Sequence, residues 1–259
     1  MKTNFTWYST DTMHARVFFG TKRIITRLSI APFRVMAYVL HATGLDHIYK
    51  PRFERHSALT YLTDDFVAKL PKHSMSVMGA RMDPMNLIIV GTEYQIKRTF
   101  KAAGWHRANP ASPIHLLFGL ISVLTGRSYE SGPFTPHYVN IGLQDFAYQM
   151  QTEKRSFSQR HHLRIWRTGT VLPDGKRIWV AASSFDTALK VQLTPPFIHH
   201  SIDPDIDGER SFIVRSLEDH GGYRLKSVNM ADPITKQKPR ANAYGAKYFT
   251  DGKAVVVEI

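Results

Sequence analysis

Short runs with strand-like character follow one another through the second half of the chain. They cover residues 137–150, 161–167, 177–184, 196–202, 223–228, 247–250 and 254–259. One segment with helical spacing, residues 209–220, interrupts them, and Asp251-Gly252, a dipeptide typical of hairpin turns, joins the last two runs. This order of elements predicts a mixed, largely antiparallel sheet.

The first half of the chain supplies helices to pack on that sheet. Residues 86–90 predict a buried strand ended by Gly91, and Thr92 is placed to cap a helix over residues 94–103. Residues 113–124 predict a second, apolar helix, whose length of about twelve residues favours a buried helix over a membrane span. The predicted fold class is therefore α+β.

The N-terminal fifth of the chain is strongly basic. Residues 1–56 hold nine Lys or Arg and three acids, and so carry +6 of the net charge of +13. Residues 12–43 predict a helix, interrupted near Pro32, with four arginines on one stripe: Arg16, Arg23, Arg27 and Arg34. Such a helix can lie in a membrane interface, or it can dock on the protein's own core with a solvated basic face. We predict a basic helical extension and linker, 1–56, before an α+β domain, 57–259.

Composition narrows the partners and the location. The chain has no cysteine, which excludes disulfides, thiolate catalysis and cysteine-ligated metals. It has no run of about 18 uncharged apolar residues and no clear signal peptide, so we expect a cytoplasmic protein, with peripheral contact to the inner membrane as the alternative. The charge suits an anionic membrane surface or a phosphate-bearing small molecule. Nucleic acid is the less expected partner, because no basic run is interleaved with aromatic residues.

The segment HHSIDPDIDGER, residues 199–210, is dense in ionisable groups. Its D-x-D-x-D-G part begins like a calcium loop, but the twelfth position, which should be a bidentate acid, is Val214. The alternative is a helix start, with Asp207 as the cap. The helix start does not account for His199, His200 or Arg210, and of these His199 and Arg210 remain candidates for a functional role.

A second polar segment, RHHLRIWR, begins at Arg160. Alternation along a strand places Arg160, His162 and Arg164 on one face. Two guanidiniums and an imidazole suit a phosphate or carboxylate ligand. The alternative is a ladder of salt bridges to acids on neighbouring strands, such as Asp186 or Asp145.

Asp186 ends a strand-like run and could orient a histidine, act as a general base or bind a metal. With His162 and His199 it would form a set of two histidines and one carboxylate for a divalent metal. The alternative is an ion pair between Asp186 and an arginine. The chain has no G-x-S-x-G, P-loop, H-E-x-x-H or G-x-G-x-x-G pattern, so the serine hydrolase, NTPase, zincin and Rossmann classes lose their usual support.

The order of these motifs resembles the LssY C-terminal domain family over about residues 60–259. The motifs that carry the resemblance are Asp83-Pro84-x-Asn86, Gly91, Ala103-Gly104-Trp105, Gln144-Asp145, the segment from Arg160 to Trp166, Asp186, Ile202-Asp203-x-x-x-Asp207-x-Glu209-Arg210 and Phe249-Thr250-Asp251-Gly252. One departure is Leu143, where relatives are expected to have arginine. If that arginine serves a ligand, the site here is altered.

The resemblance implies a bacterial domain that works near a membrane, since similar domains are fused to membrane-embedded lipid-phosphatase (PAP2-type) and DedA-type segments. We expect it to bind an anionic, phosphate-bearing, lipid-derived ligand and to hydrolyse it, with a divalent metal as the candidate cofactor. The expected anion-binding residues are Arg160, Arg164 and Arg210. The expected catalytic or metal-binding residues are His162, Asp186 and His199. The alternative is a non-catalytic module that binds lipid or protein.

Overall fold

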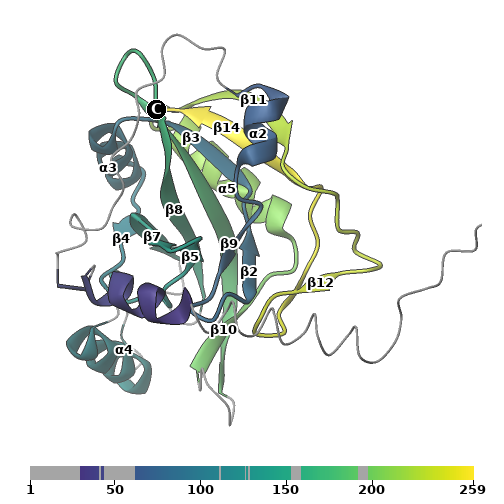
Figure 1. The fold of residues 1–259 in the computed structure, drawn as a ribbon. Coiled ribbons are helices and arrows are strands. Elements are labelled where there is room, and N and C mark those ends of the chain that lie inside the picture. Colours follow the sequence, from purple (N-terminus) through teal and green to yellow (C-terminus); the bar gives the residue numbers. More distant parts are fainter. Residues whose placement is uncertain are drawn as a thin grey trace, which may run out of the picture.

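A long, twisted sheet forms the centre of the protein (Figure 1). The computed structural model describes residues 30–40, 42–43, 62–110, 112–125, 127, 129–152, 159–191 and 198–259. Within this part the sheet has the strands β3 (Leu87–Gly91), β4 (His106–Arg107), β7 (Phe146–Gln151), β8 (Arg160–Val171), β9 (Arg177–Val191), β10 (Ile198–Ile202), β11 (Tyr223–Asn229) and β14 (Lys253–Glu258). The pair β14–β3 is parallel and the other pairs are antiparallel. The predicted α+β fold with a mixed, largely antiparallel sheet is confirmed.

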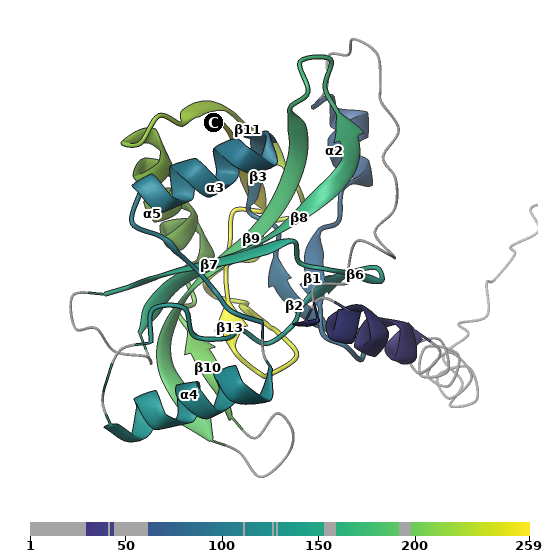
Figure 2. The ribbon, with the colours of Figure 1, turned by 90° about the vertical axis from the view of Figure 1, so that its left-hand side faces the viewer.

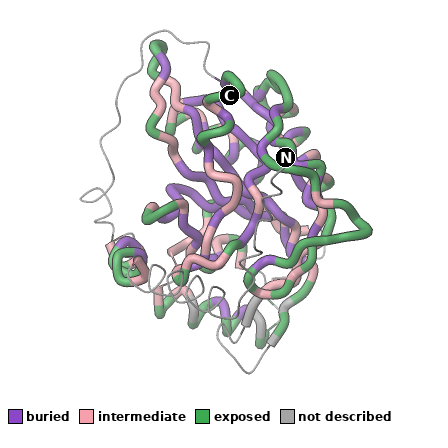
Figure 3. The backbone as a smooth tube through the Cα atoms, turned by 45° about the vertical axis from the view of Figure 1, so that its right-hand side comes forward, coloured by how far each residue is buried: buried purple, intermediate pink, exposed green. Residues whose placement is uncertain are grey.

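The strand order is β11-β14-β3-β9-β8-β7-β4, and β10 pairs with the second half of β9. The last strand of the chain, β14, therefore lies between β11 and β3 rather than at an edge. Its run of Val255, Val256 and Val257 is buried throughout, as expected of a strand that is covered on both faces. Figure 3 shows the central strands as the buried part of the molecule.

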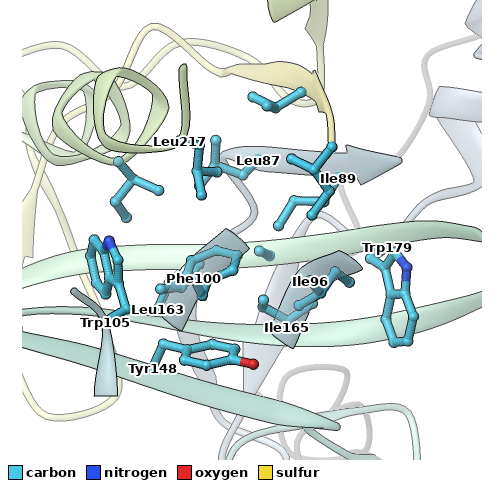
Figure 4. Close-up of a cluster of buried hydrophobic side chains, with 14 of the residues drawn as sticks. Leu87, Ile89, Ile96, Phe100, Trp105, Tyr148, Leu163, Ile165, Trp179 and Leu217 are labelled. Carbon is cyan, nitrogen blue, oxygen red and sulfur yellow. The ribbon is translucent and has the colours of Figure 1, made fainter. Parts of the chain in front are cut away.

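Helices α3 (Glu93–Ala102) and α5 (Ile206–Glu218) cover one face of the sheet (Figure 2). The hydroxyl of Thr92 accepts the N–H of Gln95, whose side chain accepts the N–H of Thr92, and this capping box confirms the predicted start of α3. Gly104 follows the helix with φ +79°, a conformation that glycine adopts without strain. Apolar side chains of both helices meet the sheet in the cluster shown in Figure 4.

The opposite face of the sheet is covered by helix α2 (Asp64–Lys69) and by a small second sheet. That sheet consists of β2 (Arg81–Pro84), β1 (His73–Met75), β5 (Tyr138–Val139) and β6 (Gly142–Leu143). The single strand predicted over 137–150 is wrong, because this segment forms β5, β6 and β7: Asn140, with φ 54°, turns the backbone between β5 and β6, and β7 pairs in the other sheet.

The predicted hairpin around Asp251-Gly252 is also wrong. Strand β13 (Lys247–Tyr248) pairs with β12 (Arg240–Ala241), whereas β14 pairs with β11 and β3. Gly252 has φ +77°, and its carbonyl accepts the N–H of Met230 at 2.9 Å and of Ala231 at 3.0 Å. The turn therefore connects two sheets instead of two paired strands.

Helix α5 begins at Ile206, earlier than the predicted start. Asp205 is its cap and accepts the N–H groups of Asp207 at 3.1 Å and Gly208 at 2.9 Å. The prediction of Asp207 as the cap is wrong, because its carboxylate instead accepts the hydroxyl of Thr250 at 2.7 Å and the N–H of Asp251 at 2.6 Å. The acid-rich turn is thus held by its own backbone and by the β13–β14 connection.

Helix α4 (Pro113–Thr125) exists as predicted, but the expectation that it is buried is wrong, because most of its large apolar side chains are exposed. Among the described residues, no helix is long and apolar enough to cross a membrane.

The described part of the N-terminal extension is helical over residues 30–40. Arg34 does not belong to a solvated basic face. It is 3% exposed, and it donates to the carbonyls of Asn140 at 2.9 Å and Val77 at 3.2 Å. This segment is therefore docked on the domain, which was the alternative interpretation. The other three arginines of the predicted stripe lie outside the described residues.

Candidate functional site

The polar side chains of β8 gather on the sheet face that carries the small sheet. Arg160, His162 and Arg164 share this face and are only 3–6% exposed, whereas Leu163 and Ile165 point into the core on the other face. The predicted alternation along this strand is confirmed.

The register of β8 with its neighbours decides which polar groups meet. Arg160 lies opposite Asp186 of β9, and His162 lies opposite Ser184 of β9 and Gln149 of β7. Residues directly opposite each other on one face of a sheet have Cβ atoms about 4.5–5.5 Å apart. The pairing alone therefore brings these side chains into hydrogen-bonding range.

Arg160 is held by protein groups on several sides. Its Nε donates to Asp186 Oδ2 at 2.9 Å and its Nη1 to Gln149 Oε1 at 2.6 Å, while Nη2 lies 3.2 Å from His200 Nε2. The guanidinium also lies over the ring of Phe134, 4.4 Å from its centroid. For Arg160, the salt-bridge alternative predicted from the sequence is the correct one.

Asp186 and His162 continue this network. Asp186 Oδ1 lies 3.2 Å from His162 Nδ1, and His162 Nε2 lies 3.1 Å from the hydroxyl of Ser184. His162 Nδ1 is within ion-pair distance of Asp186 but has no hydrogen-bond partner of good geometry among the described residues, whereas Nε2 can accept the hydroxyl proton of Ser184. These three side chains thus form an array of hydroxyl, imidazole and carboxylate. All three residues are buried.

Arg164 lies next to His162 on β8 and has a different set of contacts. Its Nη1 donates to Asp83 Oδ2 at 3.2 Å, and its guanidinium lies 5.0 Å from the centroid of Phe134. Asp83 Oδ2 is also 3.5 Å from His137 Nδ1, which lies 3.1 Å from the hydroxyl of Ser74. The Nε of Arg164 is buried and has no hydrogen-bond partner within the part of the chain that the structure describes.

The charges of the network compensate each other. Burial raises the pKa of Asp186, but His162 and His200, and then Arg160, outweigh it and hold that pKa well below its usual value. Burial lowers the pKa of His200 to about 4, with Arg160 adding to the effect and Asp186 opposing it. Burial, reinforced by Arg164, also lowers the pKa of His137 well below 6.5. At neutral pH His137 and His200 are therefore uncharged.

The structure brings four of the predicted site residues together: Arg160, His162, Arg164 and Asp186. Arg210 is not among them, because it lies on α5, which covers the opposite face of the sheet, and its guanidinium binds Asp251 with Nη1 at 2.8 Å and Nη2 at 3.0 Å. The side chain of His199 lies outside the described part, and its backbone pairs opposite Lys190. The histidine of that segment that reaches the network is His200, 3.4 Å from Asp186 and 18% exposed.

The sequence patterns did not identify several members of this network: Ser74, Asp83, Phe134, His137, Gln149, Ser184 and His200. Ser184 had a usable signal, because it lies two residues before Asp186 and so shares its face of the strand. The others come from separate segments, and only the pairing of the strands brings them here. Asp145, the other acid suggested for the ladder, pairs with Arg167 of β8: it accepts the Nε–H of Arg167 at 2.5 Å and its backbone N–H at 2.8 Å.

A divalent cation fits this network poorly. Among the described residues, no group of three or more His, Asp or Glu side chains is arranged to hold a metal ion. Both oxygens of Asp186 already face imidazole or guanidinium nitrogens, and Arg160 and Arg164 place two positive charges beside them.

Leu143, the departure from the expected family pattern, is buried on β6. It packs with Ala37 and Tyr138 in a third apolar cluster. In this chain the position contributes to the docking of the N-terminal helix.

No curated protein and no protein of solved structure matches the chain. A comparison with protein families gives a match to the LssY C-terminus family over residues 67–254, well over half of the chain. The matched segment holds the sheet except for most of β14, helices α3 and α5, the small second sheet and the Arg–His–Asp network. The chain therefore belongs to the LssY C-terminus family.

Proposed function

We propose that this domain binds a phosphate-bearing anion, of the kind found in lipid headgroups, at Arg164 in the buried network. The observation that carries the proposal is the buried Nε of Arg164, which has no hydrogen-bond acceptor among the described residues. A buried guanidinium N–H without an acceptor costs about 1–3 kcal/mol or more, so such a group calls for a partner. A phosphate oxygen is the acceptor that an arginine fork binds best.

The surroundings of Arg164 support this ligand class. Arg160 adds a second guanidinium on the same face of β8, and His162 lies between the two arginines along the strand. His200 is the partly exposed member of the network and lies at its outer side. A membrane-proximal, bacterial setting, as the family resemblance implies, would supply lipid-derived phosphates.

Titration with inorganic phosphate and with glycerol 3-phosphate, followed by calorimetry, tests the proposal. Arg164→Lys keeps the charge beside Asp83 but removes the Nε donor, and we expect affinity to fall by about tenfold or more. Arg224→Lys is the matched control, because Arg224 is an exposed arginine paired with Glu218 and should leave affinity unchanged. Circular dichroism establishes that both variants are folded. Equal affinity of wild type and Arg164→Lys, or no binding by the wild type, would contradict the proposal.

The array of Ser184, His162 and Asp186 favours a second function, hydrolysis of the bound phosphoester. In this reaction the Ser184 oxygen attacks phosphorus, His162 takes the hydroxyl proton and passes it to the leaving alcohol, and water then cleaves the phosphoserine. His162 takes the proton of that water and returns it to Ser184, so atoms and charges balance.

Release of phosphate from glycerol 3-phosphate distinguishes a hydrolase from a binding module. We expect Ser184→Ala and His162→Gln each to reduce turnover at least about a hundredfold, because each removes a required proton-transfer group, while phosphate binding persists in Ser184→Ala. Binding without turnover in the wild type would make the domain a non-catalytic module.

A further inference from the structure

Helix α4 exposes apolar side chains over most of its surface. Its sequence, PIHLLFGLISVLT, contains no charged residue. The large apolar residues that are 46–76% exposed are Ile114, Leu117, Phe118, Leu120, Ile121 and Leu124. With about 100° between successive residues of a helix, these six side chains lie within an arc of about 160°. Contiguous exposed apolar surface of this kind marks a contact with another apolar phase.

The orientation of α4 is the reverse of that of an ordinary surface helix. Gly119 and Ser122 are buried, and His115 is half-buried, so the small and polar stripe faces the protein. His115 Nδ1 lies 2.9 Å from the hydroxyl of Tyr129, and the hydroxyl of Ser122 donates to the carbonyl of Arg127. A helix that packs on a water-soluble core normally turns its apolar stripe inward. Here polar contacts attach the helix and leave its apolar face outward.

We propose that α4 inserts its apolar face into the surface of an anionic phospholipid bilayer and lies parallel to it. Its 13 residues extend about 20 Å, which is short of the hydrocarbon core of about 30 Å, so the helix can lie in the interface but cannot span it. Exposed Leu, Ile and Phe side chains gain free energy when they enter the acyl boundary.

The charge of the chain indicates that the surface in contact with α4 is an anionic bilayer. The chain carries a net charge of +13, and the exposed Arg127 lies two residues after the end of the helix. A second copy of the chain would bring a like charge to this face and be repelled, whereas anionic headgroups attract it.

Vesicle flotation of the full chain tests this proposal, which does not depend on a ligand in the Arg–His network. We expect binding to vesicles containing phosphatidylglycerol and much weaker binding to phosphatidylcholine alone. The double variant Leu120→Gln/Leu124→Gln keeps helix-forming side chains but removes two apolar groups, and its binding should fall by about tenfold or more. In a Phe118→Trp variant, brominated lipid should quench the fluorescence of the new tryptophan, because its indole enters the bilayer.

The matched control is Tyr223→Gln/Leu225→Gln, which removes two exposed apolar side chains from β11, at the other end of the molecule from α4 (Figure 1). It should bind vesicles as the wild type does. Unchanged binding of the α4 variant, or no quenching of Phe118→Trp, would overturn the proposal. Sedimentation velocity provides the other decisive outcome: a wild-type dimer that Leu120→Gln/Leu124→Gln converts to monomer would show that a second copy covers α4.

Discussion

Arg160 and Arg164 lie on the same face of one strand, yet their surroundings differ. Arg160 has Asp186, Gln149 and Phe134 as close partners. Arg164 has one carboxylate contact, through Nη1 to Asp83, and an Nε without an acceptor among the described residues. Two residues that are equivalent in the sequence pattern thus have different roles: Arg160 belongs to a salt-bridge ladder, and Arg164 is the proposed ligand-binding residue.

The burial of His200 predicts a specific pH dependence of stability. Its pKa is lowered from 6.5 to about 4, so on acidification the unfolded chain takes up the proton before the folded protein does. The stabilisation is fully present above about pH 6.5 and is lost as pH falls toward 4, amounting to on the order of 3 kcal/mol. We expect urea denaturation to show the free energy of unfolding falling over this range, and His200→Asn to reduce the slope while the share of His137 remains.

His220→Asn is the control for this measurement, because His220 is exposed at the end of α5 and contacts only the carbonyl of Ser216 at 2.8 Å among its described hydrogen bonds. It should retain the wild-type slope. The same slope in His200→Asn as in the wild type would show that His200 does not report the buried network. Asp186, with its lowered pKa, adds a further loss only below about pH 3.8.

The turn at Gly252 lies between β13 and β14, and its backbone is hydrogen-bonded to the segment after β11. Gly252 has φ +77°, and a Cβ added there would collide with the carbonyl of Ala231. Gly252→Ala should therefore destabilise the protein by about 3 kcal/mol or more, because backbone strain and a backbone clash act together. Thermal unfolding measures the effect.

Gly175, in the turn between β8 and β9, separates the two causes. It has a similar φ of +83°, but a Cβ added there would meet nothing within 4 Å. Gly175→Ala should cost only about 1–2 kcal/mol, the conformational part of the penalty. Equal losses of stability in Gly252→Ala and Gly175→Ala would mean that the clash at Gly252 is relieved by a local shift.

α4 shows how a helix can be predicted correctly and its surroundings wrongly. The mainly apolar run over residues 113–124 predicts a helix, and in an average globular protein such a helix is buried. The small and polar residues at 115, 119 and 122 are spaced four and three apart and so share one stripe of the helix. In the structure this stripe faces the protein. The spacing could predict that orientation only if it were known that no other part of the protein covers the apolar face. That knowledge requires the positions of the other elements.

The whole molecule is a sheet whose two faces differ in character. One face is an apolar core under α3 and α5, and the other is apolar under α2 but turns polar toward Arg160 and Asp186. β8 and β9 extend through both regions, so a single pair of strands belongs to the core at one end and to the candidate site at the other. The candidate site therefore depends on the stability of the core for its geometry.

Local patterns are sufficient for much of this architecture. Alternation predicted which side chains of β8 share a face, Thr92 predicted the cap of α3, and the motif order indicated the family. These features depend on residues within a few positions of each other, where the backbone geometry is set by local periodicity. The α+β class follows from the same local information.

Long-range pairing decided the rest. The register of β7, β8 and β9 placed Asp186 and Ser184 opposite Arg160 and His162. The position of α5 on the opposite face of the sheet placed Arg210 beside Asp251. The insertion of β14 between β11 and β3 prevented the hairpin that Asp251-Gly252 predicts. Each outcome depends on contacts between residues far apart in the chain, which no local pattern encodes, because their free energy arises only when the complete sheet assembles.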